Sequence, residues 1–195
     1  MKSLGINSKS LGINVKSLGI HLTYFQCETF SYHWIEGDCM QFLIKKMNRR
    51  MAAEILQWNY KPPYDFYNME LTEGNINGML SNSYYAVVDL NSRLIGFFCL
   101  GKPAQVPNGP LPDIYSENMI DIGLGLEPDR TGRGMGHLFF SFILHHVHMG
   151  FPNMPLRLTV ASFNKRAIRL YKKAGFIETA SFDKGHTAFL VMVKK

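Results

Sequence analysis

The hydrophobic and polar positions of this 195-residue chain change their period repeatedly from residue 40 onward. Apolar or alternating runs, which are typical of strands, cover residues 42–47, 83–90, 93–100, 120–126, 157–163, 176–182 and 187–194. Apolar residues at helical spacing predict helices over 49–58, from residue 72 onward, over 137–149 and over 165–173. This order, β-α-α-β-β-β-α-β-α-β-β, predicts a mixed α/β domain.

Capping and turn residues support several of these boundaries. Asn48 stands where it could cap the first helix, and Thr72 opens the second helix with Glu73 in its first turn. The pair Asn91-Ser92 separates two strand-like runs, which is typical of a β-hairpin. Local signals and periodicity therefore agree along this part of the chain.

The most informative motif is TGRGMG, residues 131–136, between the predicted strand 120–126 and the predicted helix 137–149. Its three glycines leave a loop with few side chains, so backbone N–H groups can converge on an anion at the positive end of the helix dipole. A pyrophosphate is the anion that this pattern favours. A dinucleotide fingerprint would need an acidic residue about 20 positions later, near the place where this chain has Arg157, and the triphosphate loop Gly-x-x-x-x-Gly-Lys-Ser/Thr does not occur.

A second motif follows one strand-like run later, in NKRAIRLYKKAGF at residues 164–176. The linked patterns L-x-L-x-P-x-x-T-G-R-G-M-G and N-x-x-A-x-x-x-Y-x-x-x-G-F resemble the GNAT superfamily of N-acetyltransferases, of the bacterial single-domain type. The resemblance covers residues 40–195 and implies a mixed, mostly antiparallel sheet flanked by helices, with splayed central strands that hold the cofactor. Thr131 replaces the usual Gln or Arg of the family, a change that leaves the backbone cradle intact.

The resemblance also implies acetyl-coenzyme A as the co-substrate and suggests which residues bind it. Backbone groups of Leu124 and Leu126 would face the thioester and the pantetheine arm, while their side chains belong to the core. Asn164 could simply cap the helix 165–173, or it could cap this helix while also contacting the cofactor. The other expected cofactor-binding residues form the glycine loop: Thr131, Gly132, Arg133, Gly134, Met135 and Gly136.

Two residues are candidates for catalysis. Tyr171 matches the family tyrosine that can protonate the departing thiolate, although the spacing of Tyr171 from Ala167 and Ala174 is also that of a core-facing stripe. Asp121 lies in the strand before the glycine loop, where some family members carry a carboxylate that removes the amine proton through water. An acid in an apolar run could have a raised pKa that suits a base, or it could be a structural Asp bonded to its neighbours.

Charge adds a further indication. The net charge is +6, and eight basic residues but no acidic one lie between Arg130 and Lys173. We interpret this cluster as a field for the phosphates of coenzyme A, in preference to a solvated helix face. Nucleic-acid binding is the least favoured alternative.

Composition excludes other classes of protein. With 46% apolar and 18% charged residues the chain is predicted to be globular, and its three cysteines, which suit the reducing cytoplasm, form neither a disulfide framework nor a metal pattern. No Cys or carboxylate accompanies His145, His146 and His148, so no metal site is expected. The uncharged stretch 134–156 holds histidines and prolines, which argues against a membrane span.

The first 39 residues differ from the rest. KSLGIN-like strings recur at Lys2, Lys9 and Lys16, each with a glycine that disfavours a coiled coil. We interpret residues 1–39 as an appendage outside the core and residues 40–195 as the N-acetyltransferase domain, with Met40 as a candidate internal start.

The sequence thus predicts an enzyme, monomeric or homodimeric, that moves an acetyl group from acetyl-coenzyme A to a primary amine. The acceptor could be a small molecule or a protein N-terminus. A catalytically silent acyl-coenzyme-A-binding sensor or partner module is the alternative. Between the first two helices lies a proline-broken aromatic run, a region that lines the acceptor pocket in the family and that could equally be loop packing: Trp58, Tyr60, Tyr64, Phe66 and Tyr67.

Overall fold

The computed structural model describes residues 26–27, 30–31, 42–81, 83–106 and 114–195. Most of the predicted appendage, residues 1–39, therefore lies outside the described residues. Within it, β1 (Gln26–Cys27) and β2 (Phe30–Ser31) form an antiparallel pair. The separation of the appendage from the core stays a prediction.

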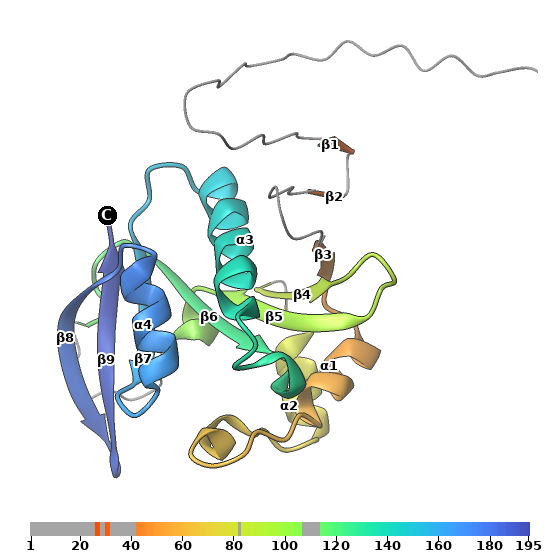
Figure 1. Ribbon diagram of the computed structural model, residues 1–195, viewed down its shortest axis with the longest axis horizontal. Coiled ribbons are helices and arrows are strands. Elements are labelled where there is room, and N and C mark those ends of the chain that lie inside the picture. The colour runs from red at the N-terminus through yellow and green to blue at the C-terminus, as the bar shows by residue number, and fades with distance from the viewer. Residues whose placement is uncertain (1–25, 28–29, 32–41, 82, 107–113) are drawn as a thin grey trace, which may run out of the picture.

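In the described part of the chain, seven strands form one sheet in the order β3-β4-β5-β6-β7-β9-β8 (Figure 1). Neighbouring strands are antiparallel except β6 and β7, which run parallel. The mixed, mostly antiparallel sheet predicted above is confirmed. The strands are β3 (Leu43–Lys46), β4 (Tyr84–Val88), β5 (Leu94–Leu100), β6 (Ile120–Leu126), β7 (Leu156–Ala161), β8 (Ile177–Lys184) and β9 (Thr187–Lys194).

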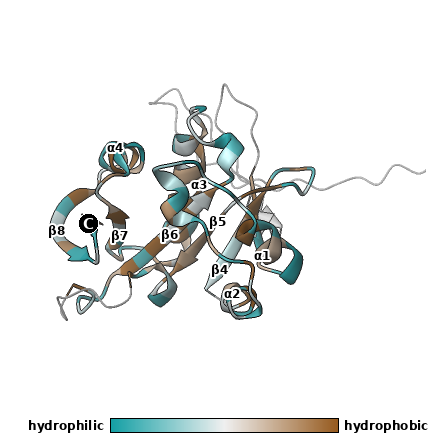
Figure 2. Cartoon of the chain, turned by 90° about the horizontal axis from the view of Figure 1, so that it is seen from below, coloured by the Kyte–Doolittle hydropathy of each residue, from teal (hydrophilic) through white to brown (hydrophobic). Residues whose placement is uncertain are grey.

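The α-helices cover both faces of this sheet (Figure 2). Val87 of β4 packs into a core with residues of α3 and α4, whereas its neighbours Ala86 and Val88 pack with residues of α1 and α2. Because successive strand residues point to opposite faces, the two pairs of helices lie on opposite sides of the sheet. The helices are α1 (Arg49–Leu56), α2 (Glu73–Met79), α3 (Met135–Gly150) and α4 (Lys165–Lys173), with short 3₁₀ turns at η1 (Tyr64–Tyr67), η2 (Lys102–Ala104) and η3 (Pro128–Arg130).

Three helices begin at the predicted caps. The side-chain oxygens of Asn48, Thr72 and Asn164 accept backbone N–H bonds at 2.9, 3.2 and 3.1 Å. The β4–β5 hairpin turns at Ser92, whose φ is 61°. Among the described helices, none combines the length and the apolar character that crossing a bilayer requires.

The sheet forks between β6 and β7. These strands pair only at their first residues, Ile120 with Leu156 and Asp121 with Arg157. Beyond these pairs the two strands diverge (Figure 1), although β5 still pairs with β6 up to Leu126 and β9 still pairs with β7. Each strand therefore keeps its outer partner while a gap opens in the middle of the sheet, as the splayed-strand prediction required.

Candidate active site

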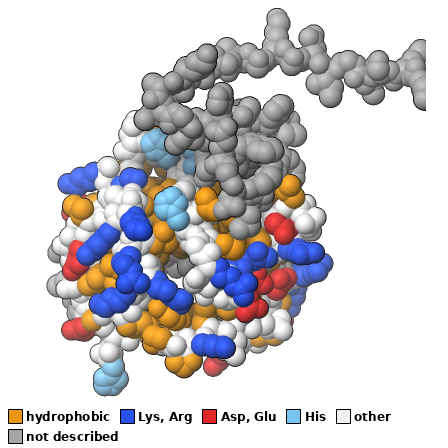
Figure 3. Space-filling model, in the orientation of Figure 1, with side chains coloured by type: hydrophobic (Ala, Val, Ile, Leu, Met, Phe, Trp, Pro, Cys, Tyr) orange, Lys and Arg blue, Asp and Glu red, His pale blue; other side chains and the backbone are white. Residues whose placement is uncertain are grey.

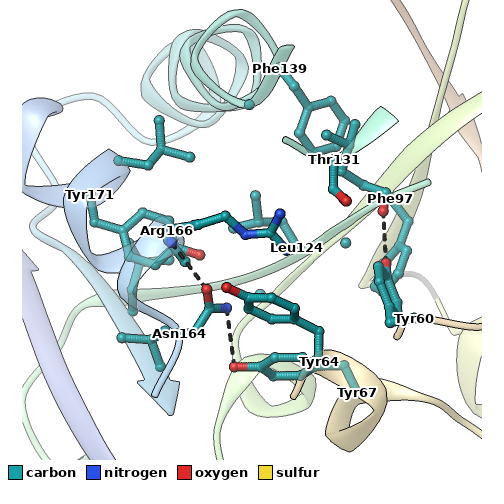
Figure 4. Close-up of a pocket in the computed structure, with 18 of the residues that line it drawn as sticks. Tyr60, Tyr64, Tyr67, Phe97, Leu124, Thr131, Phe139, Asn164, Arg166 and Tyr171 are labelled. Atoms are coloured by element: carbon teal, nitrogen blue, oxygen red, sulfur yellow. Dashed lines mark hydrogen bonds between the residues drawn. The ribbon is translucent and has the colours of Figure 1, made fainter. Parts of the chain in front are cut away.

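A cavity of about 550 Å³ lies where β6 and β7 diverge (Figure 4). It is bordered by the loop after α1, the open end of β6, the glycine loop, the end of β7 and the first part of α4. This volume is in the range of small-molecule sites. The sequence-predicted site residues that line it are Leu124, Leu126, Thr131, Gly132, Gly134, Gly136, Asn164 and Tyr171.

The open end of β6 offers backbone groups to this cavity. The carbonyl of Asp121 and the N–H of Glu127 hydrogen-bond to residues in or next to β5. Backbone groups alternate in direction along a strand, so those of Leu124 and Leu126 face the other side, from which β7 has diverged. The side chains of these two leucines pack against the main core. The geometry therefore leaves the backbone role implied by the resemblance open to the N–H groups of both residues, whereas the carbonyl of Leu126 accepts a hydrogen bond from Tyr60.

The glycine loop turns sharply into α3. Gly132 and Gly134 have φ values of 75° and 81°, in the left-handed region that only glycine adopts at little cost. Gly134 is the N-cap of α3, and in contrast to α1, α2 and α4, no side chain of the described residues caps this helix. The N–H groups of its first turn therefore receive no side-chain cap from the described residues, which is the arrangement that the predicted anion site requires.

Basic side chains gather beside this loop and over α4 (Figure 3). The guanidinium carbon of Arg166 lies 4.0 Å from the ring centroid of Tyr64, and a Cβ on Gly132 would lie 3.3 Å from its Nη1. Arg166 therefore spans the space between the glycine loop and the aromatic run. The exposed cations of α4 are Lys165, Arg166, Arg169, Lys172 and Lys173.

Tyr171 points from α4 into the cavity (Figure 4) and is 8% exposed. Its ring lies 5.0 Å from that of Phe140, between centroids. Burial raises the pKa of the Tyr171 hydroxyl well above its usual value, and the nearby Tyr67 adds to this effect. Tyr171 thus packs in the core and also lines the cavity, while its role as the acid for the departing thiolate stays a prediction.

Two hydrogen bonds join the aromatic run to the rest of the cavity wall. The hydroxyl of Tyr60 donates to the carbonyl of Leu126 at 2.8 Å, and Nδ2 of Asn164 donates to the hydroxyl of Tyr67 at 3.3 Å. Burial raises the pKa of both tyrosines, so both remain neutral. Their hydroxyls are engaged with the protein, which leaves mainly ring surface to the cavity.

Comparison with known families decides the class of this fold and site. The model of the acetyltransferase (GNAT) family matches residues 48–176. The chain belongs to this family. No curated protein sequence matches the chain.

Solved structures of GNAT acetyltransferases resemble the chain in fold. A chimera of the spermidine N-acetyltransferase of Vibrio cholerae is 18% identical, with a TM-score of 0.55 over 78% of this chain and 93% of that one. A GNAT acetyltransferase of Bacillus anthracis is 14% identical, with a TM-score of 0.60 over 78% and 93%. An aminoglycoside acetyltransferase in complex with coenzyme A is 18% identical, with a TM-score of 0.60 over 78% and 94%. At these identities the likeness shows the GNAT fold.

Within this GNAT fold, Asp121 sits at the closed end of the fork and is not among the residues that line the cavity. Asp121 is 4% exposed and Arg157 is 2% exposed. Arg157 donates to the Asp121 carboxylate from Nε at 2.5 Å and from Nη2 at 3.0 Å, and Gln105 donates to it at 2.7 Å. This arrangement favours the structural role for Asp121 over that of a catalytic base.

Not every other predicted residue lines the cavity. Arg133 and Met135 are not among the lining residues, and Met135 packs against the main core. Phe66 packs against Phe163, with ring centroids 5.6 Å apart. The other members of the aromatic run line the cavity, while their role in binding the acceptor stays a prediction: Trp58, Tyr60, Tyr64 and Tyr67.

The histidines of α3 include one with a packing role. The ring of His146 lies edge-on to Tyr85 and Phe98, with centroids 6.2 and 5.8 Å apart, and burial lowers its pKa. Among the described residues, no three His, Cys, Asp or Glu side chains are grouped so that they could hold a metal ion.

Several lining residues were not among the site residues predicted from the sequence: Phe97, Phe139, Thr159, His137 and Arg166. For Phe97 and Phe139 the sequence did contain an indication, because a strand glycine lies against each ring. A Cβ on Gly125 would lie 2.4 Å from the ring of Phe97, and a Cβ on Gly96 would lie 2.4 Å from that of Phe139. Glycines inside predicted strands indicate such close approach of a neighbouring group.

Proposed function

We propose that this GNAT protein transfers the acetyl group of acetyl-coenzyme A to the nitrogen of a primary amine. One observation carries the proposal: a single cavity at the fork of the sheet is lined by the glycine loop, by the open end of β6 and by Tyr171. The cofactor's phosphates, its thioester and a proton donor for its sulfur would each find matching groups there.

The chain's own residues fit coenzyme A. Backbone N–H groups of the glycine loop and of the first turn of α3 suit a pyrophosphate, and the guanidinium of Arg166 beside Gly132 adds charge-assisted donors. Backbone groups of Leu124 and Leu126 would hold the pantetheine arm and the acetyl carbonyl. When bound, acetyl-coenzyme A supplies the acetyl group as an activated thioester.

The protein residues then have defined tasks. The N–H of Leu124 donates to the carbonyl oxygen, on which negative charge develops during attack by the neutral amine. The N–C bond forms and the C–S bond breaks. Tyr171 gives its proton to the departing sulfur, and the proton that the nitrogen loses restores the hydroxyl through solvent. The high pKa that burial gives Tyr171 keeps this proton in place until it is needed.

One observation keeps the sensor function as a second candidate. Among the described lining residues none is Asp or Glu, so no carboxylate is on hand to accept the amine proton. A protein that binds acyl-coenzyme A without turnover would share this feature.

The test combines binding and turnover. Calorimetry with coenzyme A measures cofactor affinity, and release of free thiol from acetyl-coenzyme A across a panel of primary amines measures transfer. We expect both to be positive. Binding without thiol release from any amine would favour the sensor, and no binding of coenzyme A would contradict both functions.

A further inference from the structure

The wall of the cavity is mostly apolar. Among the described residues that line it, none is acidic, and the aromatic and aliphatic side chains outnumber the polar ones. The segment after α1 adds Met69, which is 40% exposed beside the cavity. A ligand that enters here therefore exchanges water for ring and methylene surface.

The hydroxyls of Tyr60 and Tyr67 do little to make this wall polar. The hydroxyl of Tyr60 donates to the carbonyl of Leu126 and that of Tyr67 accepts from Asn164, so both are already hydrogen-bonded within the protein. Burial raises the pKa of both, so neither supplies a negative charge to pair with an ammonium group.

Arg166 offers no site for a ligand cation. Its guanidinium covers the Tyr64 ring at 4.0 Å, and thus already uses the ring that a ligand cation could have approached. A polycation would lose part of its hydration on entering, and the described lining residues include no carboxylate to replace it. A single ammonium group escapes this cost, because an apolar surrounding lowers its pKa and the amine must be neutral for attack.

We infer that the acceptor is a small monoamine with an aromatic or aliphatic body, and not a polyamine or an aminoglycoside, although proteins with those substrates in their names share the fold. This inference rests on the proposed acetyltransferase function. The apolar wall binds the body of the amine. It also removes water from the ammonium group, which lowers the pKa of that group and favours loss of the proton that a base would otherwise accept. The proton leaves to solvent as the amine enters.

The test compares amines of different charge. We would measure kcat/KM by thiol release with 2-phenylethylamine, hexylamine, spermidine and kanamycin, and the affinity of each amine for the protein saturated with coenzyme A. The expected result is that the two monoamines exceed spermidine and kanamycin by about tenfold or more in both measurements. Equal or better performance of spermidine or kanamycin would overturn the inference while leaving the acetyltransferase function intact.

The binding arm separates the two proposals. Selective binding of monoamines without thiol release would support the inferred ligand class and contradict the transferase function. A short peptide with an N-terminal Phe that exceeds both monoamines would overturn the inference in favour of a protein N-terminus. Failure of every amine to bind would overturn it as well.

A designed change of charge gives an independent check. Met69→Glu places a carboxylate at the cavity wall, and Met69→Gln is the uncharged control of similar size. The ratio of spermidine to 2-phenylethylamine activity should rise about twofold to fivefold in the Glu variant relative to the Gln variant, as for a partly exposed ion pair. An unchanged ratio would mean that the amine does not bind at this wall.

Discussion

The two ends of strand β6 have different roles, since one closes the sheet and the other borders the cavity. At its start, Asp121 and Arg157 bury a charged pair between β6 and β7 and close the sheet. At its end, Leu124 and Leu126 turn their backbone groups toward a cavity from which β7 has withdrawn. The closed end is built from side chains that satisfy one another, and the open end leaves backbone groups for a ligand.

This difference shows how the fork is held at a fixed opening. Arg157 also donates to the carbonyl of Ile114 at 2.7 Å, and its guanidinium lies 4.9 Å from the ring centroid of Tyr115. The ion pair thus connects β6, β7 and the chain before β6 at the point where the strands part. Pairing at this point lets the strands diverge further along without losing their register.

The largest expected effect comes from breaking the closed end. Asp121→Asn leaves the buried guanidinium of Arg157 without its counter-charge, which should lower the free energy of unfolding by about 3–5 kcal/mol. Urea unfolding followed by circular dichroism measures the loss. A change below about 1 kcal/mol would show that the pair does not hold the fork.

A double variant separates stability from chemistry. Asp121→Leu with Arg157→Met removes both charges and should recover most of the lost stability, since apolar groups often replace a buried ion pair well. Thiol release by this variant at near the wild-type rate would agree with a structural Asp121. A folded but inactive double variant would restore Asp121 as a candidate base.

The same comparison explains what the sequence could predict. The glycine loop, the hairpin and the caps at Asn48, Thr72 and Asn164 are local, since the residues that make each feature are neighbours in the chain. The order of strands and helices followed from the same local periodicity.

Contacts between distant segments could not be predicted in this way. Asp121 had the sequence environment of a base with a raised pKa, and only the fold brings Arg157 and Gln105 to it. In the sequence Arg166 is one of several cations in a basic helix, whereas in the fold its guanidinium stacks on the ring of Tyr64. Side-chain partnerships across the sheet decide these roles, and a single sequence does not show them.

At the open end, the largest expected effect on rate comes from Tyr171→Phe. The ring keeps its packing against Phe140 and Phe176, so stability should change little. Loss of the proton donor should lower kcat by about tenfold to a thousandfold, with coenzyme A affinity unchanged. Tyr85→Phe, at a ring that stacks on Phe98 away from the cavity, is the control. A fully active Tyr171→Phe variant would leave this residue a packing role only.

The pH dependence of kcat gives a second test of the role of Tyr171. An ordinary tyrosine is half deprotonated near pH 10, whereas burial raises the pKa of Tyr171 above that value. The acid therefore stays protonated, and kcat should show no decline that depends on this residue up to about pH 10. A decline at lower pH that disappears in Tyr171→Phe would contradict the raised pKa.

The glycine loop should respond more weakly to a single change. Gly134→Glu adds a negative charge at the start of α3 and a side chain at a φ of 81°, and should weaken coenzyme A binding about tenfold. Gly185→Glu is the matched control, because Gly185 has a φ of 59° in the exposed β8–β9 turn. Calorimetry should show a loss for the first variant only. Equal losses would point to a general effect of strain or charge.

The smallest expected effect tests the link between the two walls of the cavity. Tyr60→Phe removes the hydrogen bond to the Leu126 carbonyl and should lower stability by about 0.5–1.5 kcal/mol. Because this bond fixes the aromatic run against the open end of β6, the KM for the amine should rise while coenzyme A affinity holds. A change in coenzyme A affinity with an unaltered amine KM would instead assign Tyr60 to the cofactor's side of the cavity. The open end would then recognise the cofactor through side chains as well as through backbone groups.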